Sequence, residues 1–190
     1  MARRALIFLV LGVLASMAAV AVAATAPKPQ VVTDAKGDVN GLDLTRFALA
    51  RGADGRLRAS LTLAAAWEGK DLLTETGPPG SLCVKAWTTA APPDVTPDYL
   101  ICVTGQADGT LRGSILKTRA NKLPERTGAA SLSRPSERTV TLRFSQTAIG
   151  KPATLYAAAE TTRPGCPRGS CIDLAPDAPK TLTLKLRSTT

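Results

Sequence analysis

Oxygen-bearing side chains are concentrated in one short stretch, TDAKGDVNGLDLTRF, which spans residues 33–47. It contains Asp34, Asp38, Asn40 and Asp43. Carboxylate and amide oxygens are the ligands that Ca²⁺ takes, about six to eight at a time, so these four side chains are candidate ligands of a structural calcium ion. Asp and Asn also cap turns by bonding to the nearby backbone, which requires no ion. The sequence leaves both interpretations open.

The spacing of these residues differs from that of the twelve-residue calcium loop. If Asp38 and Asn40 were the first two ligands of such a loop, its third and twelfth positions would fall on Leu42 and Leu49, whose side chains cannot bind the ion. A calcium site here would instead need the two ends of the loop to converge. We expect Gly37 to allow the sharp reversal that brings them together.

Four cysteines, Cys83, Cys102, Cys166 and Cys171, allow three different sets of disulfides. Cys83 and Cys102 lie in two apolar runs on either side of the turn-rich stretch TTAAPPDVTPD, so a hairpin would place them side by side. Cys166 and Cys171 enclose only the short loop PRGS. We therefore predict the pairs Cys83–Cys102 and Cys166–Cys171. A zinc site is the rival interpretation, and it is disfavoured because the chain has no CxxC motif and no histidine.

Histidine is absent from the whole sequence, which excludes the Ser-His-Asp and Cys-His forms of nucleophilic catalysis. Paired cysteines would supply no thiolate. Hydrolysis by two carboxylates stays formally open, but no two acids stand in a context that marks one as the acid and the other as the nucleophile. We therefore expect a protein that is not an enzyme and has no catalytic residues.

The N-terminus has the three-part layout of a secretory signal peptide. Arg3 and Arg4 precede an apolar run over residues 5–24, which ends in small residues. We predict a signal peptide over residues 1–23, a linker over residues 24–30 and a single domain over residues 31–190. The run approaches the ~20 residues that span a bilayer, so retention as an anchor is the alternative to cleavage. Either way we expect export, to the cell envelope or beyond it, with no membrane span after cleavage.

The formal net charge is +9, from 24 basic and 15 acidic residues. The basic residues are scattered along the chain, with no dense run and few aromatic residues between them. A nucleic-acid-binding surface normally clusters its cations. We therefore expect no nucleic-acid partner, and some affinity for anionic cell-envelope polymers or lipid headgroups.

Alternation of apolar and polar residues predicts the elements that would position these groups. The alternation is clearest over residues 57–63, 139–144 and 182–187, and weaker strands are expected over residues 31–33, 42–50, 82–87, 99–103, 111–117, 129–133 and 153–160. Ser145 to Gly150 is typical of one helical turn, with Ser145 as its N-cap and Gly150 as its stop. About ten short strands and one such turn predict an all-β fold, an antiparallel two-sheet β-sandwich.

Two runs, DAKGDVNGLDLTRFALARGADGRLRASLTL and TVTLRFSQTAIGKPATLYAAAET, resemble the DOMON-like, family 9 carbohydrate-binding-module-like β-sandwiches of secreted bacterial proteins. The resemblance covers the first and last thirds of the predicted domain. It implies sugar binding on aromatic platforms and a structural calcium ion. Some DOMON relatives bind haem, but here the only methionines are Met1 and Met17 and histidine is absent, so the usual axial ligands are missing.

The aromatic residues available for a sugar platform are Trp67, Trp87, Tyr99 and Tyr156, and we select Trp87 as the candidate ligand-binding residue. In the predicted hairpin it shares a face with Cys83 and Cys102, opposite a more uniformly apolar face. If the apolar face is the core, Trp87 is partly exposed beside the bridge. The alternative is that Trp87 packs over the bridge as a buried side chain.

These observations together predict an exported, disulfide-stabilised, non-catalytic binding module for a polysaccharide or a cell-envelope polymer. The alternative is a structural or protein-interaction domain of the cell envelope that binds no small ligand.

Overall fold

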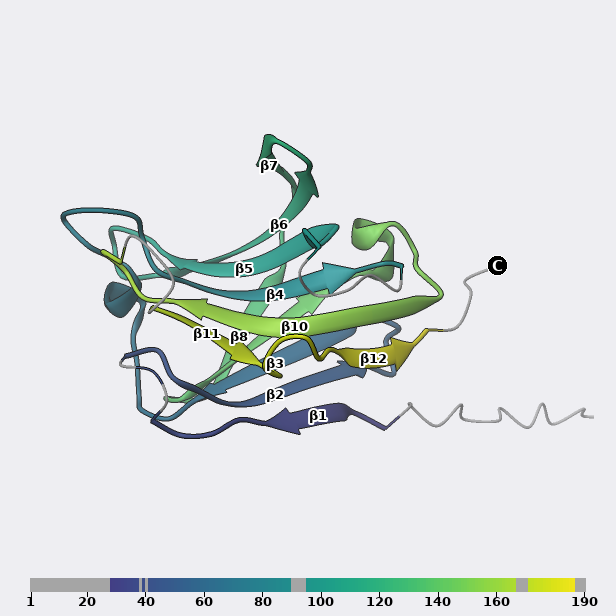
Figure 1. Ribbon diagram of the computed structural model, residues 1–190, viewed down its shortest axis with the longest axis horizontal. Helices are drawn as coiled ribbons and strands as arrows, with labels where there is room; N and C mark the ends of the chain where they lie inside the picture. The colour runs from purple at the N-terminus through teal and green to yellow at the C-terminus, as the bar shows by residue number, and fades with distance from the viewer. Residues whose placement is uncertain (1–27, 38, 40, 90–94, 167–170, 187–190) are drawn as a thin grey trace, which may run out of the picture.

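The computed structural model describes residues 28–37, 39, 41–89, 95–166 and 171–186. The predicted signal peptide, most of the predicted linker, and Asp38 and Asn40 therefore lie outside the described residues. The described chain forms two antiparallel β-sheets packed face to face (Figure 1), which confirms the predicted all-β sandwich. In this part of the chain, no helix has the length and apolar character needed to cross a bilayer.

The first sheet has five strands, in the spatial order β1 (Gln30–Thr33), β2 (Leu44–Arg51), β3 (Leu57–Leu63), β9 (Thr139–Phe144) and β8 (Ser131–Ser136). The second sheet has the order β11 (Ile172–Ala175), β10 (Thr154–Thr162), β4 (Ser81–Trp87), β5 (Tyr99–Gly105), β6 (Leu111–Arg119) and β7 (Lys122–Gly128). A further strand, β12 (Leu182–Lys185), also pairs with β10. Non-consecutive strands, β3 with β9 and β10 with β4, therefore lie side by side.

Two single-turn 3₁₀ helices connect the sheets, η1 (Gly69–Leu72) between β3 and β4 and η2 (Gln146–Ile149) between β9 and β10. The second is the turn predicted from the sequence. The Ser145 hydroxyl accepts a hydrogen bond from the backbone N–H of Ala148 at 3.1 Å, and Gly150 ends the turn in the left-handed region at φ 79°. Glycine adopts that conformation without the steric cost that a Cβ would add.

The core lies between the two sheets and follows the predicted alternation. Leu57, Ala59, Leu61 and Leu63 of β3 are all buried, while the intervening residues face solvent or the outer layer. Phe47 on β2 and Phe144 on β9 are among the largest side chains fully enclosed between the sheets. The apolar face of the β4–β5 hairpin, with Leu82, Val84, Ile101 and Val103, packs into the same core, as expected.

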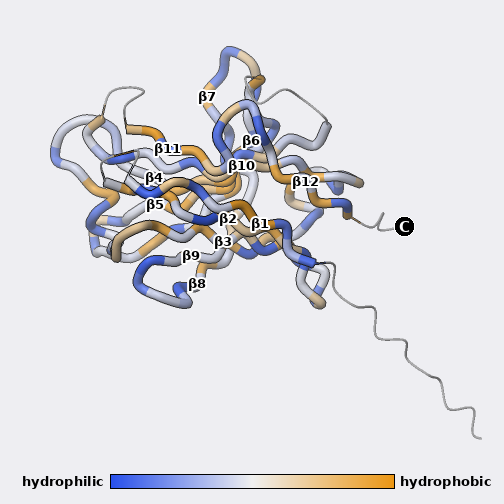
Figure 2. The backbone as a smooth tube through the Cα atoms, turned by 60° about the horizontal axis from the view of Figure 1, so that its bottom comes forward, coloured by the Kyte–Doolittle hydropathy of each residue, from blue (hydrophilic) through white to orange (hydrophobic). Residues whose placement is uncertain are grey.

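Two strands, β7 and β11, have no counterpart in the prediction. Every residue of β7 except Gly128 is exposed and the strand contains Pro124, so its sequence carries no apolar alternation. It is a strand because it pairs with β6, with Lys117 opposite Glu125 and Leu116 opposite Arg126. The hairpin of β6 and β7 stands out from the body of the sandwich (Figures 1 and 2).

Candidate functional site

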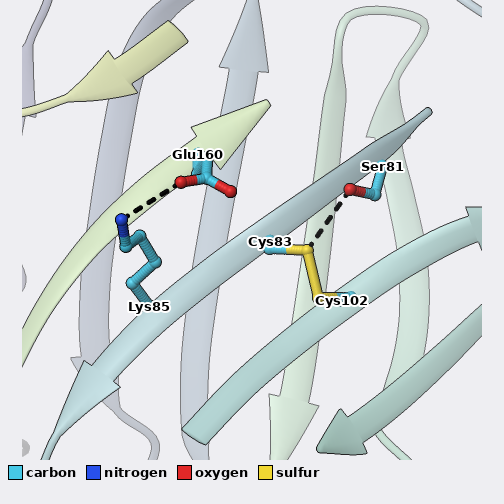
Figure 3. The surroundings of a disulfide bond; sticks show 5 residues. All are labelled: Ser81, Cys83, Lys85, Cys102 and Glu160. Carbon is cyan, nitrogen blue, oxygen red and sulfur yellow. Dashed lines mark hydrogen bonds and ion pairs between the residues drawn. A yellow bond between two sulfur atoms is a disulfide. The ribbon is translucent and has the colours of Figure 1, made fainter. Parts of the chain in front are cut away.

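Both predicted disulfides are present, and together they include all four cysteines. Cys83 on β4 and Cys102 on β5 are directly opposite in the ladder, with 4.0 Å between their Cα atoms. That separation is typical of the narrow, non-hydrogen-bonded kind of antiparallel pair, which brings two side chains close together. The bridge faces away from the core, beside a half-buried ion pair in which Lys85 Nζ lies 3.1 Å from Glu160 Oε2 (Figure 3).

Trp87 lies on this outer face but is only 1% exposed, so the expected partial exposure is wrong. Its Nε1 donates a hydrogen bond to the carbonyl oxygen of Val95 at 2.9 Å. The segment that follows β11 covers the ring. Pro176 and Ala178 lie against it, and together with Trp87 they line a pocket of only about 20 Å³. A ring enclosed in this way offers no free face on which a sugar could stack.

The loop that carries Asp34 and Asp43, which we call the Asp-rich loop, makes the hydrogen bonds expected of a turn. Asp43 is 5% exposed, and its Oδ2 accepts from the backbone N–H of Gly37 at 2.7 Å. At the other end, the backbone N–H of Asp34 donates to the carbonyl oxygen of Thr45 at 3.0 Å. The second carboxylate oxygen of Asp43, Oδ1, is buried and has no hydrogen-bond donor among the described residues. One oxygen of this carboxylate therefore holds the turn closed.

The calcium site predicted at Asp34, Asp38, Asn40 and Asp43 stays a prediction. Two of these residues, Asp38 and Asn40, lie outside the described residues. Within the described ranges, no three acidic, histidine or cysteine side chains are grouped closely enough to hold a metal ion.

Two buried polar side chains of the second sheet hold the C-terminal end of this loop. Asp173 on β11 is 4% exposed, and its Oδ2 accepts from the backbone N–H of Leu44 at 2.5 Å. The hydroxyl of Thr161 on β10 donates to the carbonyl oxygen of Leu42. Because a buried polar group that loses its partner costs about 1–3 kcal/mol, these bonds fix the loop firmly to the opposite sheet.

A cleft of about 700 Å³ opens where the chain leaves β3 and approaches the turn between β8 and β9. Most of its lining side chains are charged or polar, and they are Trp67, Glu68, Lys70, Asp71, Arg134, Ser136 and Glu137, together with Ala66. A second hollow of about 380 Å³ shares Ala66, Trp67 and Asp71 with the first and extends to Gly41 of the Asp-rich loop. We call these two adjoining hollows together the Trp67 cleft.

Trp67 belongs to both hollows and to the core. Its side chain is only 4% exposed, and its backbone N–H donates to the carbonyl oxygen of Glu137 at 3.2 Å, which joins it to the β8–β9 turn. The indole Nε1 is buried and meets no acceptor in the part of the chain that the structure describes. A buried donor without an acceptor costs about 1–3 kcal/mol. A ligand oxygen or a water molecule that reached this N–H would recover that cost.

Arg134 of β8 packs over the Trp67 ring, with 4.2 Å between its Cζ and the ring centroid. Its Nη2 donates to the carbonyl oxygen of Trp67 at 2.6 Å and also to that of Glu137. The N–H groups of Nε and Nη1 have no acceptor among the described residues. A guanidinium is a planar array of donors in fixed directions. Arg134 is therefore held rigidly while part of that array remains available to a ligand.

The carboxylates of the cleft are suited to accepting hydrogen bonds. Lys70 Nζ lies 2.9 Å from Glu68 Oε2, and this bond lowers the pKa of Glu68 and raises the pKa of Lys70. Asp71 Oδ2 accepts from the backbone N–H of Glu68 at 2.6 Å, which caps η1. A catalytic general acid needs a carboxyl whose pKa is raised, so the shift of Glu68 is opposite to that requirement.

Sequence reasoning named Trp67 only as a secondary candidate, and it missed Arg134 and the carboxylates.

No protein-family model, curated protein or solved structure matches the chain. The resemblance to DOMON-like sandwiches therefore stays a hypothesis.

Proposed function

We propose that this chain is an exported, non-catalytic binding module, and that it binds a polysaccharide or another hydroxyl-rich cell-envelope polymer in the Trp67 cleft. The observation that carries the proposal is the mixture of hydrogen-bond donors and acceptors in that cleft. Arg134 provides N–H donors, and Glu68, Asp71 and Glu137 provide carboxylate acceptors. Sugar hydroxyls both donate and accept hydrogen bonds, so a ligand rich in them can use both kinds of group.

The shape and burial of the cleft support a polymer held by hydrogen bonds. Its two adjoining hollows are lined by residues that extend from β8 to Gly41 of the Asp-rich loop, so an extended polymer could contact both. The Trp67 ring is buried under Arg134, so its face is not available for stacking. Recognition here would therefore differ from the aromatic platform that the resemblance implies.

Two observations support the non-catalytic and exported parts of the proposal. The hydrogen bond from Lys70 lowers the pKa of Glu68, which is the opposite of the shift that a general acid needs. Both cysteine pairs are oxidised, and such bridges persist mainly in oxidising compartments outside the cytoplasm.

The test is a glycan array that includes cell-envelope polysaccharides, followed by calorimetric titration of the best ligand against the full chain. Arg134→Gln should weaken binding by about 10- to 100-fold, because a hydrogen bond to a charged group contributes about 1.5–3 kcal/mol. The affinity of Arg134→Lys, which keeps the charge and loses the planar donor array, should lie between the affinities of the wild type and of Arg134→Gln. Arg138→Gln is the matched control, since Arg138 is an exposed arginine of the same turn that lines neither hollow.

Circular dichroism and thermal melts of each variant would separate lost binding from lost folding. Unchanged affinity in a folded Arg134→Gln variant would remove the cleft from the proposal. A folded chain that bound no glycan on the array would favour the alternative, a structural or protein-interaction domain.

A further inference from the structure

The hairpin of β6 and β7 concentrates positive charge at its outer end. Residues 117–126 contain four basic residues and one acid, whereas the whole chain of 190 residues has a net charge of only +9. The acid, Glu125, is already paired, with its Oε2 2.8 Å from Arg119 Nη2. Lys117, Lys122 and Arg126 have no ion-pair partner among the described residues. Four basic residues within ten positions thus lie at the outer end of one hairpin.

A large exposed apolar side chain lies at the same end of the hairpin. Leu123 is 91% exposed, about twice the exposure of any other large apolar side chain in the described part of the chain. It follows Lys122 directly and lies two residues from the turn, where Asn121 adopts a left-handed conformation at φ 58°. The hairpin stands out from the sandwich (Figures 1 and 2), so this end can reach a flat surface before the body does.

We propose that the outer end of the β6–β7 hairpin docks on the surface of an anionic lipid bilayer. Leu123 would enter the boundary between headgroups and acyl chains, while Lys117, Lys122 and Arg126 contact lipid phosphates. Basic side chains next to an exposed apolar residue form the combination that binds this interface, because the aliphatic part is buried as the charges meet anionic headgroups. Long basic side chains can also extend their charged ends back to the headgroup level.

The apolar residue decides between a bilayer and other polyanions. Phosphates of a nucleic acid or of an anionic polysaccharide would satisfy the cations but would leave Leu123 in water. The edge of β7 is also unsuited to adding a strand of a protein partner, since Pro124 offers no backbone N–H there. A bilayer accounts for both the charge and the leucine. The hairpin contributes no residue to the Trp67 cleft, so this inference does not depend on the proposed polymer ligand.

The test uses the full chain carrying Leu123→Trp and vesicles of either pure phosphatidylcholine or an equimolar mixture with phosphatidylglycerol. The two natural tryptophans, Trp67 and Trp87, are buried, so a change of emission reports on the hairpin. On the anionic vesicles we expect a blue shift, and quenching by lipids brominated on their acyl chains. Added salt should reverse both, because it screens the attraction. The site-specific signal also separates the hairpin from any membrane binding by the apolar N-terminal run.

Charge variants of the Leu123→Trp chain measure how much the basic residues contribute to vesicle binding. Lys122→Gln with Arg126→Gln should weaken binding about 25-fold, since each cation near an anionic surface contributes about fivefold. Arg56→Gln with Arg138→Gln, two exposed arginines outside the hairpin, is the matched control and should change little. Arg134→Gln, which tests the polymer cleft, should leave vesicle binding unchanged.

Several results would overturn the proposal. One is that the fluorescence emission of the Leu123→Trp chain does not shift on anionic vesicles, or shifts equally on neutral ones. Another is vesicle binding that the paired hairpin variant does not weaken. A third is a chain that does not bind anionic vesicles but does bind heparin or duplex DNA, with equal affinity whether residue 123 is the natural Leu123 or is changed by Leu123→Ser. That result would identify a general polyanion surface in place of a bilayer site.

Discussion

Replacing Cys83 and Cys102 together by alanine tests how strongly the cross-strand bridge stabilises the sandwich. The bridged cysteines are 19 residues apart in the sequence, whereas Cys166 and Cys171 are 5 apart. If each bridge acts by restricting the unfolded chain, the longer loop contributes about 3 kcal/mol to the free energy of unfolding and the shorter one about 2 kcal/mol. Cys83 and Cys102 are also only 5% exposed, so each substitution removes a buried sulfur and adds to the loss.

Urea denaturation followed by tryptophan fluorescence is a suitable assay, because Trp67 and Trp87 are buried in the folded chain. The Cys83→Ala/Cys102→Ala variant should lose about 3–5 kcal/mol, and its m-value should rise because the unfolded chain is freer to expand. For a domain of this size the melting temperature should fall by about 6–20 °C. The Cys166→Ala/Cys171→Ala variant is the control. If this control lost as much stability, or the first variant less than about 1 kcal/mol, the loop-length reasoning would be refuted.

Two other predictions concern acid stability and calcium. Arg143 Nη2 lies 2.7 Å from Asp54 Oδ2, and this hydrogen bond lowers the pKa of Asp54. The stabilisation from this bond is therefore present above the ordinary carboxyl pKa and is lost as the pH falls through the lower folded-state pKa. The urea midpoints of the wild type and of Asp54→Asn should differ near about pH 7 and converge near about pH 2. A difference that stays constant with pH would contradict this prediction. If the Asp-rich loop binds calcium, added Ca²⁺ should raise the melting temperature, chelator should lower it, and Asp38→Asn should abolish the difference. Identical melting curves in calcium and in excess EDTA would leave the loop as a turn.

The sequence predicted those elements whose stability comes from a buried face. In β3, alternate residues from Leu57 to Leu63 point into the core, so burial imposes the period of two that the sequence displays. The η2 turn was predictable from Ser145 and Gly150 because its capping is local. By contrast, β7 is exposed almost throughout and is a strand only through its pairing with β6, so it leaves no periodic signal.

The candidate site was less predictable because its contacts are made between remote segments. Trp67 and Arg134 are 67 residues apart, and they meet only because the β8–β9 turn lies beside the chain that leaves β3. The burial of Trp87 likewise depends on Pro176 and Ala178, almost ninety residues later. A hairpin pattern shows which face such a ring occupies, but it does not show what covers that face.

Every edge strand of the two described sheets is short or contains proline. β1, β11 and β12 have 4 residues each, while the longer edge strands β8 and β7 contain Pro135 and Pro124. A long, regular strand edge is a template on which another chain can add by backbone hydrogen bonding, and this addition is a common first step of aggregation. Proline interrupts such a template because it has no N–H to donate. The edges of this sandwich are therefore poor templates for the addition of a strand from another copy of the chain.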